Sequence, residues 1–140
     1  AAIHSRFSHD NTERILKAME NPYVNVIAHP TGRIIGQREG YPLDLEAVFK
    51  KAKETGTALE VNAYYNRLDL KDSLCRLAVK NGVYLSISTD SHHADHLWMM
   101  KLGVGTARRG WVEKRSVLNA LSLRELLSFV KRKRKKFGVE

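Results

Sequence analysis

The sequence has few of the features that mark secreted, membrane-spanning or unstructured chains. Its 140 residues include one cysteine, Cys75, so an internal disulfide cannot form and a reducing compartment is expected. Hydrophobic residues make up 43% and charged residues 28%, an ordinary globular balance. No apolar run approaches the roughly 18 residues of a membrane span, and no signal peptide is recognisable. We therefore expect one soluble, cytoplasmic domain with no membrane partner.

Acidic residues are also scarce relative to basic ones. The chain has 24 Lys and Arg against 15 Asp and Glu, a net charge of +9. Much of this charge lies in one basic run, Lys131, Arg132, Lys133, Arg134, Lys135 and Lys136. We expect a domain over residues 1–130, followed by a basic tail over residues 131–140. Such a run suits contact with nucleic-acid phosphates. It equally suits a solvated helix end, where cations complement the helix dipole.

Short apolar runs alternate with amphipathic segments along the chain. Four runs are typical of buried strands, at Ala1–Ile3, Val24–Ala28, Ala58–Val61 and Val83–Ser88. Helical spacing is found in Asn11–Glu20, in a segment from the cap Asp44 to Gly56, in Leu70–Lys80 behind the cap Asp69, and after the capping box Ser122-x-x-Glu125. Strands alternating with helices over short connections predict parallel β/α architecture.

The inward faces of the last two helices follow from the same spacing. We expect the third helix to bury Leu70, Leu74, Leu77 and Ala78, and the last helix to bury Leu123, Leu126, Leu127 and Val130 before the basic tail. No internal repeat or linker divides the chain. The first apolar run starts at residue 1, and four or five strands are too few to close a barrel, so an open edge is expected to pair with another chain.

Imidazole and carboxylate side chains follow three of the four expected strands. His4 follows the first run, His29 the second, and Asp90 with His92 the last. Carboxyl ends of parallel strands converge on one face, where sites are built. Asp90 and His92, two residues apart, project to the same side, and this donor set suits zinc, manganese or iron. The alternative is that each histidine is simply a hydrogen-bonded strand-end residue.

Other polar residues lie near these strand ends. Glu60 and Asn62 project to one side of the third strand by its two-residue alternation. The remaining histidines, His9, His93 and His96, suit surface or capping positions better than ligand positions.

Two basic loops are candidates for binding phosphate. Arg33 and Arg38 lie in the loop that turns directly after His29, and their guanidinium groups suit phosphate oxygens. Arg108 and Arg109 precede Trp111 in a second loop, and they can instead pair with neighbouring carboxylates. Trp111 suits stacking on a nucleic-acid base, although a partly buried packing role is commoner for such a residue.

Longer strings give the sequence a family resemblance. The segments "HSRF", "NPYVNVIAHPTGRIIGQREGYPLDLEAVFKKAKETGTALEVNA", "ISTDSH" and "LGVGTARRGWVEKRSVLNAL" resemble the C-terminal part of the PHP domain of bacterial and archaeal family X DNA polymerases. The strings "AHP" and "STDSH" are shared with many PHP proteins, whereas "HPTGR" and "TARRGW" point to the polymerase branch. The resemblance runs from about Ile3 to Val130.

The resemblance implies a fold and an activity. PHP domains resemble a distorted (β/α)7 barrel with up to three metal ions, so we expect an α/β chain forming a partial, TIM-like barrel. Polymerase X versions are described as manganese-dependent 3′–5′ exonucleases of base-excision repair, with DNA as partner. Carried over residue by residue, His4, His29, Asp90 and His92 match family metal ligands for Mn²⁺ or Zn²⁺, with Fe²⁺ as a further candidate.

The resemblance also implies roles for the remaining candidates. Asp90 and His92 are the expected catalytic residues among the metal ligands. For Arg33, in the matched loop after His29, the resemblance implies a place beside substrate phosphate. From their charge and position alone we also expect substrate phosphate at Arg38, Arg108 and Arg109, and DNA backbone at Lys131, Arg132, Lys133 and Arg134. Glu60 and Asn62 match a strand that borders the family site, without being ligands. A nucleoid-associated location in the cytoplasm would follow.

The family pattern is matched only in part. Its opening His-x-His motif and its metal-bridging glutamate are absent from these 140 residues, as are the polymerase palm and fingers. We therefore expect the second half of a PHP domain, whose partners are the other half and the polymerase core. Two alternatives stay open, namely a small-molecule phosphatase of the histidinol-phosphatase type and a non-catalytic DNA-binding or structural module. Under the polymerase interpretation we expect the isolated chain to be an inactive fragment of an active parent protein.

Overall fold

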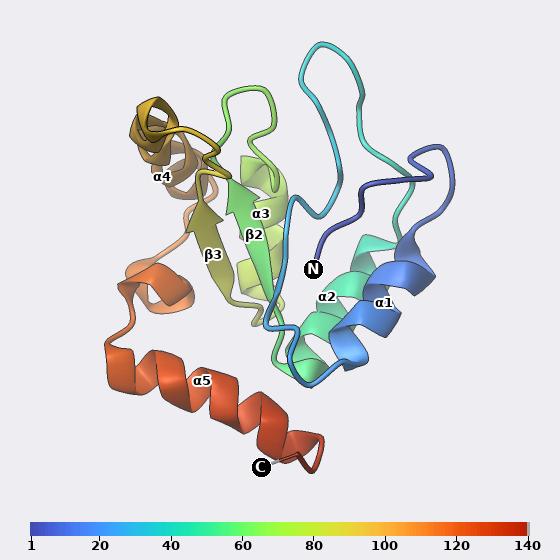
Figure 1. Ribbon diagram of the computed structural model, residues 1–140, viewed down its shortest axis with the longest axis vertical. Helices are drawn as coiled ribbons and strands as arrows, with labels where there is room; N and C mark the ends of the chain where they lie inside the picture. The colour runs from blue at the N-terminus through green and yellow to red at the C-terminus, as the bar shows by residue number, and fades with distance from the viewer. Residues whose placement is uncertain (140) are drawn as a thin grey trace.

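The computed structural model describes residues 1–139 and shows a small parallel sheet flanked by helices (Figure 1). The strands are β1 (Val26–Ile27), β2 (Ala58–Asn62) and β3 (Leu85–Ser88). The helices are α1 (Thr12–Glu20), α2 (Leu45–Thr55), α3 (Asp72–Lys80), α4 (Met100–Arg109) and α5 (Leu123–Lys136), with 3-10 turns η1 (Ala94–Met99), η2 (Lys114–Ser116) and η3 (Leu118–Ala120). The predicted α/β class is confirmed.

The sheet has the order β1-β2-β3, and all three strands are parallel. Its central strand, β2, is buried at every position, as expected for a strand covered on both faces. Leu59 lies beside Ile27 on one side and beside Leu85 on the other. Since the strands are parallel, the segments that follow β1, β2 and β3 all leave from the same edge of the sheet.

The first apolar run does not form the predicted strand. Residues 1–3 have no strand assignment, although the Ala1 amino group donates to the Val26 carbonyl at 2.9 Å and the Ala28 N–H donates to the Ala1 carbonyl at 2.8 Å. The run therefore lies beside β1 without a continued ladder. Within residues 1–139 three strands form the sheet, and the expected partial (β/α)7 barrel is not confirmed.

Helix ends follow the sequence signals at α2 and α5, whereas α3 does not begin at the expected cap. Asp44 caps α2 by accepting from the Ala47 N–H at 3.0 Å, and Gly56 ends it in the left-handed conformation. Ser122 and Glu125 form the expected capping box. Asp69 is not a cap, because α3 begins three residues later, and the buried Asp69 carboxylate instead accepts from another loop.

Two predicted inward faces are wrong in part. Leu77 of α3 is 45% exposed, and three leucines expected in the core under α5 are exposed as well, Leu123, Leu126 and Leu127. The buried residues of α5 are Phe129 and Lys133, four positions apart, and Phe129 packs edge-on against Tyr84. The reason is that α5 crosses below the sheet as a single helix and only one narrow face of it meets the domain (Figure 1).

The basic run belongs to α5 instead of forming a separate tail, since the helix continues to Lys136. No helix within residues 1–139 is long and apolar enough to cross a membrane.

Candidate functional site

Glu60 is the centre of a polar network at the carboxyl edge of the sheet. Its buried carboxylate accepts from the His29 backbone N–H at 2.5 Å, from the Asn62 side-chain amide at 3.2 Å and from the Ser88 hydroxyl. Burial raises the pKa of Glu60, while these donors act in the opposite direction. One carboxylate on β2 therefore ties together the segments that follow β1 and β3.

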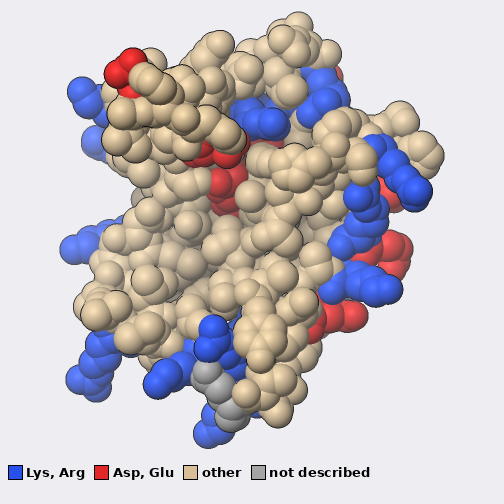
Figure 2. All heavy atoms as spheres, viewed as in Figure 1, with Lys and Arg blue, Asp and Glu red and all other residues tan. Residues whose placement is uncertain are grey.

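Asp90 joins this network from the end of β3. Its carboxylate accepts from the Asn62 amide at 3.2 Å, and the Arg67 guanidinium lies 4.0 Å away. The two-residue alternation that places Glu60 and Asn62 on one side is thereby confirmed. Figure 2 shows acidic side chains gathered in a hollow where β2 and β3 end, with basic side chains beside them.

His4 and His29 come together at the same edge. Their ring centroids are 5.2 Å apart at an interplanar angle of 78°. His29 is buried, and its Nδ1 has no hydrogen-bond partner among residues 1–139. Burial, followed by the charge of Arg67, lowers the pKa of His29, so this imidazole is neutral at neutral pH. A neutral imidazole with an unused ring nitrogen is the form that ligates metal ions.

His92 lies apart from this pair. It is exposed, and its Nδ1 lies 2.7 Å from the Asp90 carbonyl oxygen, which leaves Nε2 directed elsewhere. Within residues 1–139, no three His, Cys, Asp or Glu side chains lie close enough together to form a metal site as they stand. The structure thus brings His4, His29 and Asp90 to one edge with Glu60, whereas the ligand role of all four predicted residues stays a prediction. The unused His29 nitrogen is the feature that fits a metal.

Asp69 positions the loop that follows His29. Its carboxylate accepts from the backbone N–H groups of Thr31 and Gly32, at 3.0 and 2.9 Å. Burial raises the pKa of Asp69 to about 6. Gly32 has φ +64°, and a side chain there would meet Tyr41, with a Cβ only 2.3 Å from the ring. The tight turn after His29 is therefore fixed by a buried carboxylate and a glycine.

The arginines predicted to bind phosphate mainly contact the protein itself. Arg33 donates to the carbonyls of Arg67 and Leu68, at 2.7 and 2.5 Å. Arg38 donates to the Gly32 carbonyl and lies 3.9 Å above the Phe7 ring centre.

At the end of α4, Arg109 pairs with Asp72 at 3.1 Å, which matches the carboxylate-holding alternative, and Arg108 is exposed. Trp111 is 77% exposed, so the partly buried packing role does not describe it.

The basic residues of α5 divide into two groups. Lys131 and Arg132 are exposed. Lys133 is 2% exposed and donates to the Val24 carbonyl and to the Thr57 hydroxyl, so in this structure it is not available to a DNA phosphate. Arg134 is half-buried with its guanidinium 5.3 Å from the Tyr23 ring centre. Of the four predicted backbone contacts, two are openly accessible.

Sequence reasoning missed the central position of Glu60 and the positioning role of Asp69. In both cases a signal was present, because each carboxylate interrupts an apolar stretch: Glu60 stands between Leu59 and Val61, and Asp69 between Leu68 and Leu70. A charged side chain in such a setting is expected to be buried with hydrogen-bond donors around it.

Comparison with known proteins places these features in context. No protein-family model matches the chain. It is 46% identical over 135 residues to the DNA polymerase/3′-5′ exonuclease PolX of Bacillus subtilis (strain 168), covering 94% of this chain. It is 28% identical over 136 residues to a probable phosphatase of Thermoanaerobacter sp. (strain X514), and 41% identical over 91 residues to a probable phosphatase of Syntrophotalea carbinolica.

The chain spans only part of these relatives, 24% of the PolX protein and 53% of the Thermoanaerobacter phosphatase. The resemblance to a bacterial family X DNA polymerase is confirmed. The expectation that the chain corresponds to only a part of such a polymerase is confirmed as well. The names of these relatives, an exonuclease and phosphatases, both denote hydrolysis of phosphate esters.

Proposed function

We propose that this chain is the C-terminal part of a PHP-type phosphoesterase domain in a family X DNA polymerase, and that the domain hydrolyses phosphodiesters at DNA 3′ ends in base-excision repair. The observation that carries the proposal is the cluster of His4, His29, Glu60 and Asp90 at the carboxyl edge of the sheet. The similarity to an exonuclease-named relative over 94% of the chain supports the same reading.

Divalent ions, Mn²⁺ or Zn²⁺ with Fe²⁺ as a further candidate, would be held by His4, His29, Asp90 and His92. When bound, such an ion supplies Lewis-acid activation of water and neutralises charge that develops on phosphate oxygens. His29 offers its buried Nδ1, kept neutral by burial. The complete domain would hold up to three ions, with residues outside this chain completing the set.

The surrounding residues hold the ligands in place. Glu60 accepts from the His29 N–H and from Ser88, which fixes the ends of β1 and β3 relative to each other. Asn62 donates to Asp90 and so orients that carboxylate. We call the carboxyl edge of the sheet, with His4, His29, Glu60 and Asp90, the rim. The Arg67 guanidinium lies 4.0 Å from the Asp90 carboxylate, and its positive charge at the rim favours an anionic substrate.

Basic side chains would bind the rest of the DNA. Arg33 donates to the backbone carbonyls of Arg67 and Leu68. It thereby positions the segment after β2 that carries Arg67, beside which phosphate would bind. Exposed Lys131 and Arg132 of α5 would add sequence-independent affinity through phosphate contacts. Exposed Arg108 and Trp111 are the remaining candidates for contact with a strand.

A matched pair of histidine variants tests the proposal. The full-length protein that contains this chain is incubated with Mn²⁺ and a 5′-labelled single-stranded oligonucleotide, and shortening from the 3′ end is followed on gels. His4→Ala should lower the rate by about 10–100-fold, the usual cost of disturbing a metal site. His9→Ala, which removes an exposed histidine away from the rim, should leave the rate unchanged.

Equal rates in the two variants, or no Mn²⁺-dependent cleavage by the unaltered full-length protein, would contradict the proposal. Binding of the oligonucleotide by the isolated chain, with no cleavage by the full-length protein, would instead identify a non-catalytic DNA-binding module.

A second candidate function is favoured by the phosphatase-named relatives, which match 93% of the chain in the Thermoanaerobacter case. This would be hydrolysis of a small phosphomonoester of the histidinol-phosphate type at the same rim. The salt dependence separates the two, because DNA cleavage at low substrate concentration should fall steeply as salt rises, while turnover of a small phosphate ester should change little.

A further inference from the structure

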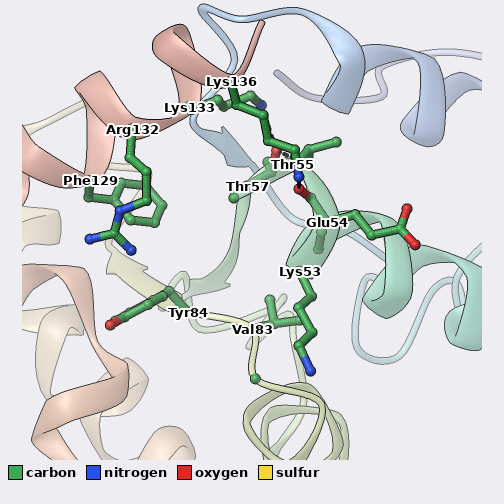
Figure 3. A pocket seen from close by; sticks show the side chains of 13 residues that line it. Lys53, Glu54, Thr55, Thr57, Val83, Tyr84, Phe129, Arg132, Lys133 and Lys136 are labelled. Atoms are coloured by element: carbon green, nitrogen blue, oxygen red, sulfur yellow. Dashed lines mark hydrogen bonds between the residues drawn. The ribbon is translucent and has the colours of Figure 1, made fainter.

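A second polar site lies at the amino ends of the strands, opposite the rim that holds His29 and Asp90. It is a cavity of about 260 Å³ between the segment that joins α2 to β2, the start of β3 and α5. Basic side chains dominate its polar lining: Lys53, Arg132, Lys133 and Lys136. In Figure 3 the lysines of α5 reach toward Thr55 and Thr57, and Arg132 lies between Phe129 and Tyr84.

Lys133 is the buried member of this group. Its Nζ donates to the Val24 carbonyl and to the Thr57 hydroxyl, the latter at 2.6 Å. Thr57 in turn lies 2.8 Å from Thr55, whose hydroxyl donates to the Lys51 carbonyl at 2.8 Å. These bonds use two of the three N–H groups of the Lys133 ammonium. The third N–H group of Lys133 is left over. The Nζ atom lies 6.0 Å from the centre of the Phe137 ring.

The charge of Lys133 has no acidic partner among residues 1–139, since its two acceptors are a carbonyl and a hydroxyl. An ammonium that is 2% exposed is costly to keep charged without a counter-ion. Burial accordingly lowers the pKa of Lys133 to about 8, which still leaves it mostly protonated at neutral pH.

The other cationic groups add to this charge and do not neutralise it. Lys136 donates to the backbone carbonyl of Glu54, not to its carboxylate, and Figure 3 shows that carboxylate turned away from Arg132 and Lys133. The cavity therefore combines enclosure, hydroxyl groups and several cations with an acidic side chain that points elsewhere. That combination is suited to an anion with several oxygens.

We propose that this cavity binds a phosphate group, held by Lys133, Lys136 and Arg132 from α5 and by the hydroxyl of Thr57, the residue before β2. The group is either a free phosphate or phosphomonoester, or one phosphate of a DNA strand that passes under the sheet. The site is separate from the strand-end rim and does not depend on the function proposed for it.

The test is a titration of the ¹⁵N-labelled chain followed by backbone amide shifts, with inorganic phosphate in one arm and an eight-residue oligothymidylate without a terminal phosphate in the other. Saturable shifts of the amides of residues 55–57 and 82–84 are expected. Saturation by inorganic phosphate identifies a small anion as sufficient. Saturation by the oligonucleotide alone identifies the nucleic-acid backbone as the source of the phosphate.

Charge-matched variants of α5 provide the control. Lys136→Gln and Arg132→Gln should each raise the apparent dissociation constant about tenfold, the usual effect of removing one charge-assisted hydrogen bond. Lys135→Gln removes the same charge from the same helix but from an exposed residue that does not line the cavity, and it should change the constant by less than about twofold.

Lys133→Met removes the buried charge itself, and binding should be lost if the variant folds. Since that variant can fail to fold, the decision rests on the exposed residues. Shifts that stay linear in both arms, or a Lys135→Gln effect as large as that of Lys136→Gln, would overturn the proposal.

Discussion

The two ends of the same parallel sheet carry opposite chemistry. At the carboxyl ends of the strands, Glu60, Asp90 and two histidines gather, a set of groups that accept protons or bind cations. At the amino ends, Lys133 and its basic neighbours gather around a cavity, a set that binds anions. Both ends keep an ionisable side chain buried, Glu60 in one case and Lys133 in the other. Burial of charge in a domain this small costs stability, so we interpret both ends as functional.

The difference lies in how the buried charge is compensated. Glu60 receives three hydrogen bonds from the chain itself, from the His29 backbone N–H, from the Asn62 side chain of its own strand and from the Ser88 side chain of β3. Lys133 is held by two neutral acceptors and has a donor left over. The rim is thus organised by the chain's own contacts, whereas at the amino ends Lys133 has no acidic partner within residues 1–139, and a ligand would supply that counter-charge.

The largest expected effect on the free energy of unfolding concerns α5, the helix that covers the amino ends of the strands. Phe129→Ala should destabilise the chain by about 3–4 kcal/mol, because the buried ring packs against Tyr84 and its loss leaves a void. Leu127→Ala, two residues earlier but 50% exposed, should cost less than about 0.5 kcal/mol. Urea unfolding measures both. Equal costs would mean that α5 presents its leucine face to the domain, as the spacing alone predicts.

A smaller effect on stability is expected from Asp69, the buried carboxyl group that holds the loop after His29. Burial raises the pKa of this carboxyl to about 6 from 3.8, so between these values the folded chain binds more protons than the unfolded chain. The contribution of Asp69 to stability is therefore fully present below pH 4 and is lost as the pH rises through 6, by an amount of about 2–3 kcal/mol.

The measurement is the free energy of unfolding of the chain minus that of Asp69→Asn, from pH 4 to pH 7. Subtraction removes the contributions of exposed carboxylates such as Glu20, whose pKa is lowered by Lys51 and which act in the opposite direction. A difference that is constant with pH, or that grows as the pH rises, would contradict the buried setting of Asp69.

A matched pair of glycines in α4 gives the smallest effect. A Cβ at Gly103 would lie 2.6 Å from the Cβ of Ala63 and 2.7 Å from Ile87, whereas one at Gly105 would meet nothing within 4 Å. Gly103→Ala should therefore cost about 1–3 kcal/mol by overpacking against the rim end of the sheet. Gly105→Ala should stabilise the helix by about 0.5–1 kcal/mol. Thermal unfolding of the two variants gives opposite shifts in Tm.

Much of the fold follows from local patterns in the sequence. The apolar run 58–61 and the caps Asp44 and Ser122 gave β2, α2 and the start of α5, because capping and strand burial depend on neighbouring residues. The exposed leucines of α5 could not be foreseen, since helical spacing predicts an apolar stripe but not which part of it meets the sheet.

The site was predictable at the level of which strand ends meet, and His4, His29 and Asp90 do lie at one edge. It was not predictable at the level of contacts. Arg33 and Arg38 fit a phosphate clamp by position, yet their guanidinium groups are engaged by carbonyls that are distant in sequence or hidden in the loop turn. Long-range partners of this kind depend on tertiary packing, which no local pattern encodes.

The central claim is that the two ends of the sheet bind ions of opposite charge, and Mn²⁺ tests it most directly. Bound Mn²⁺ broadens the amide signals of nearby residues, so substoichiometric Mn²⁺ is added to the ¹⁵N-labelled chain at neutral pH. The account predicts selective broadening at residues 28–32, 60–63 and 88–92, with residues 55–57 and 82–84 unaffected. Broadening at both ends alike, or at neither, would contradict it.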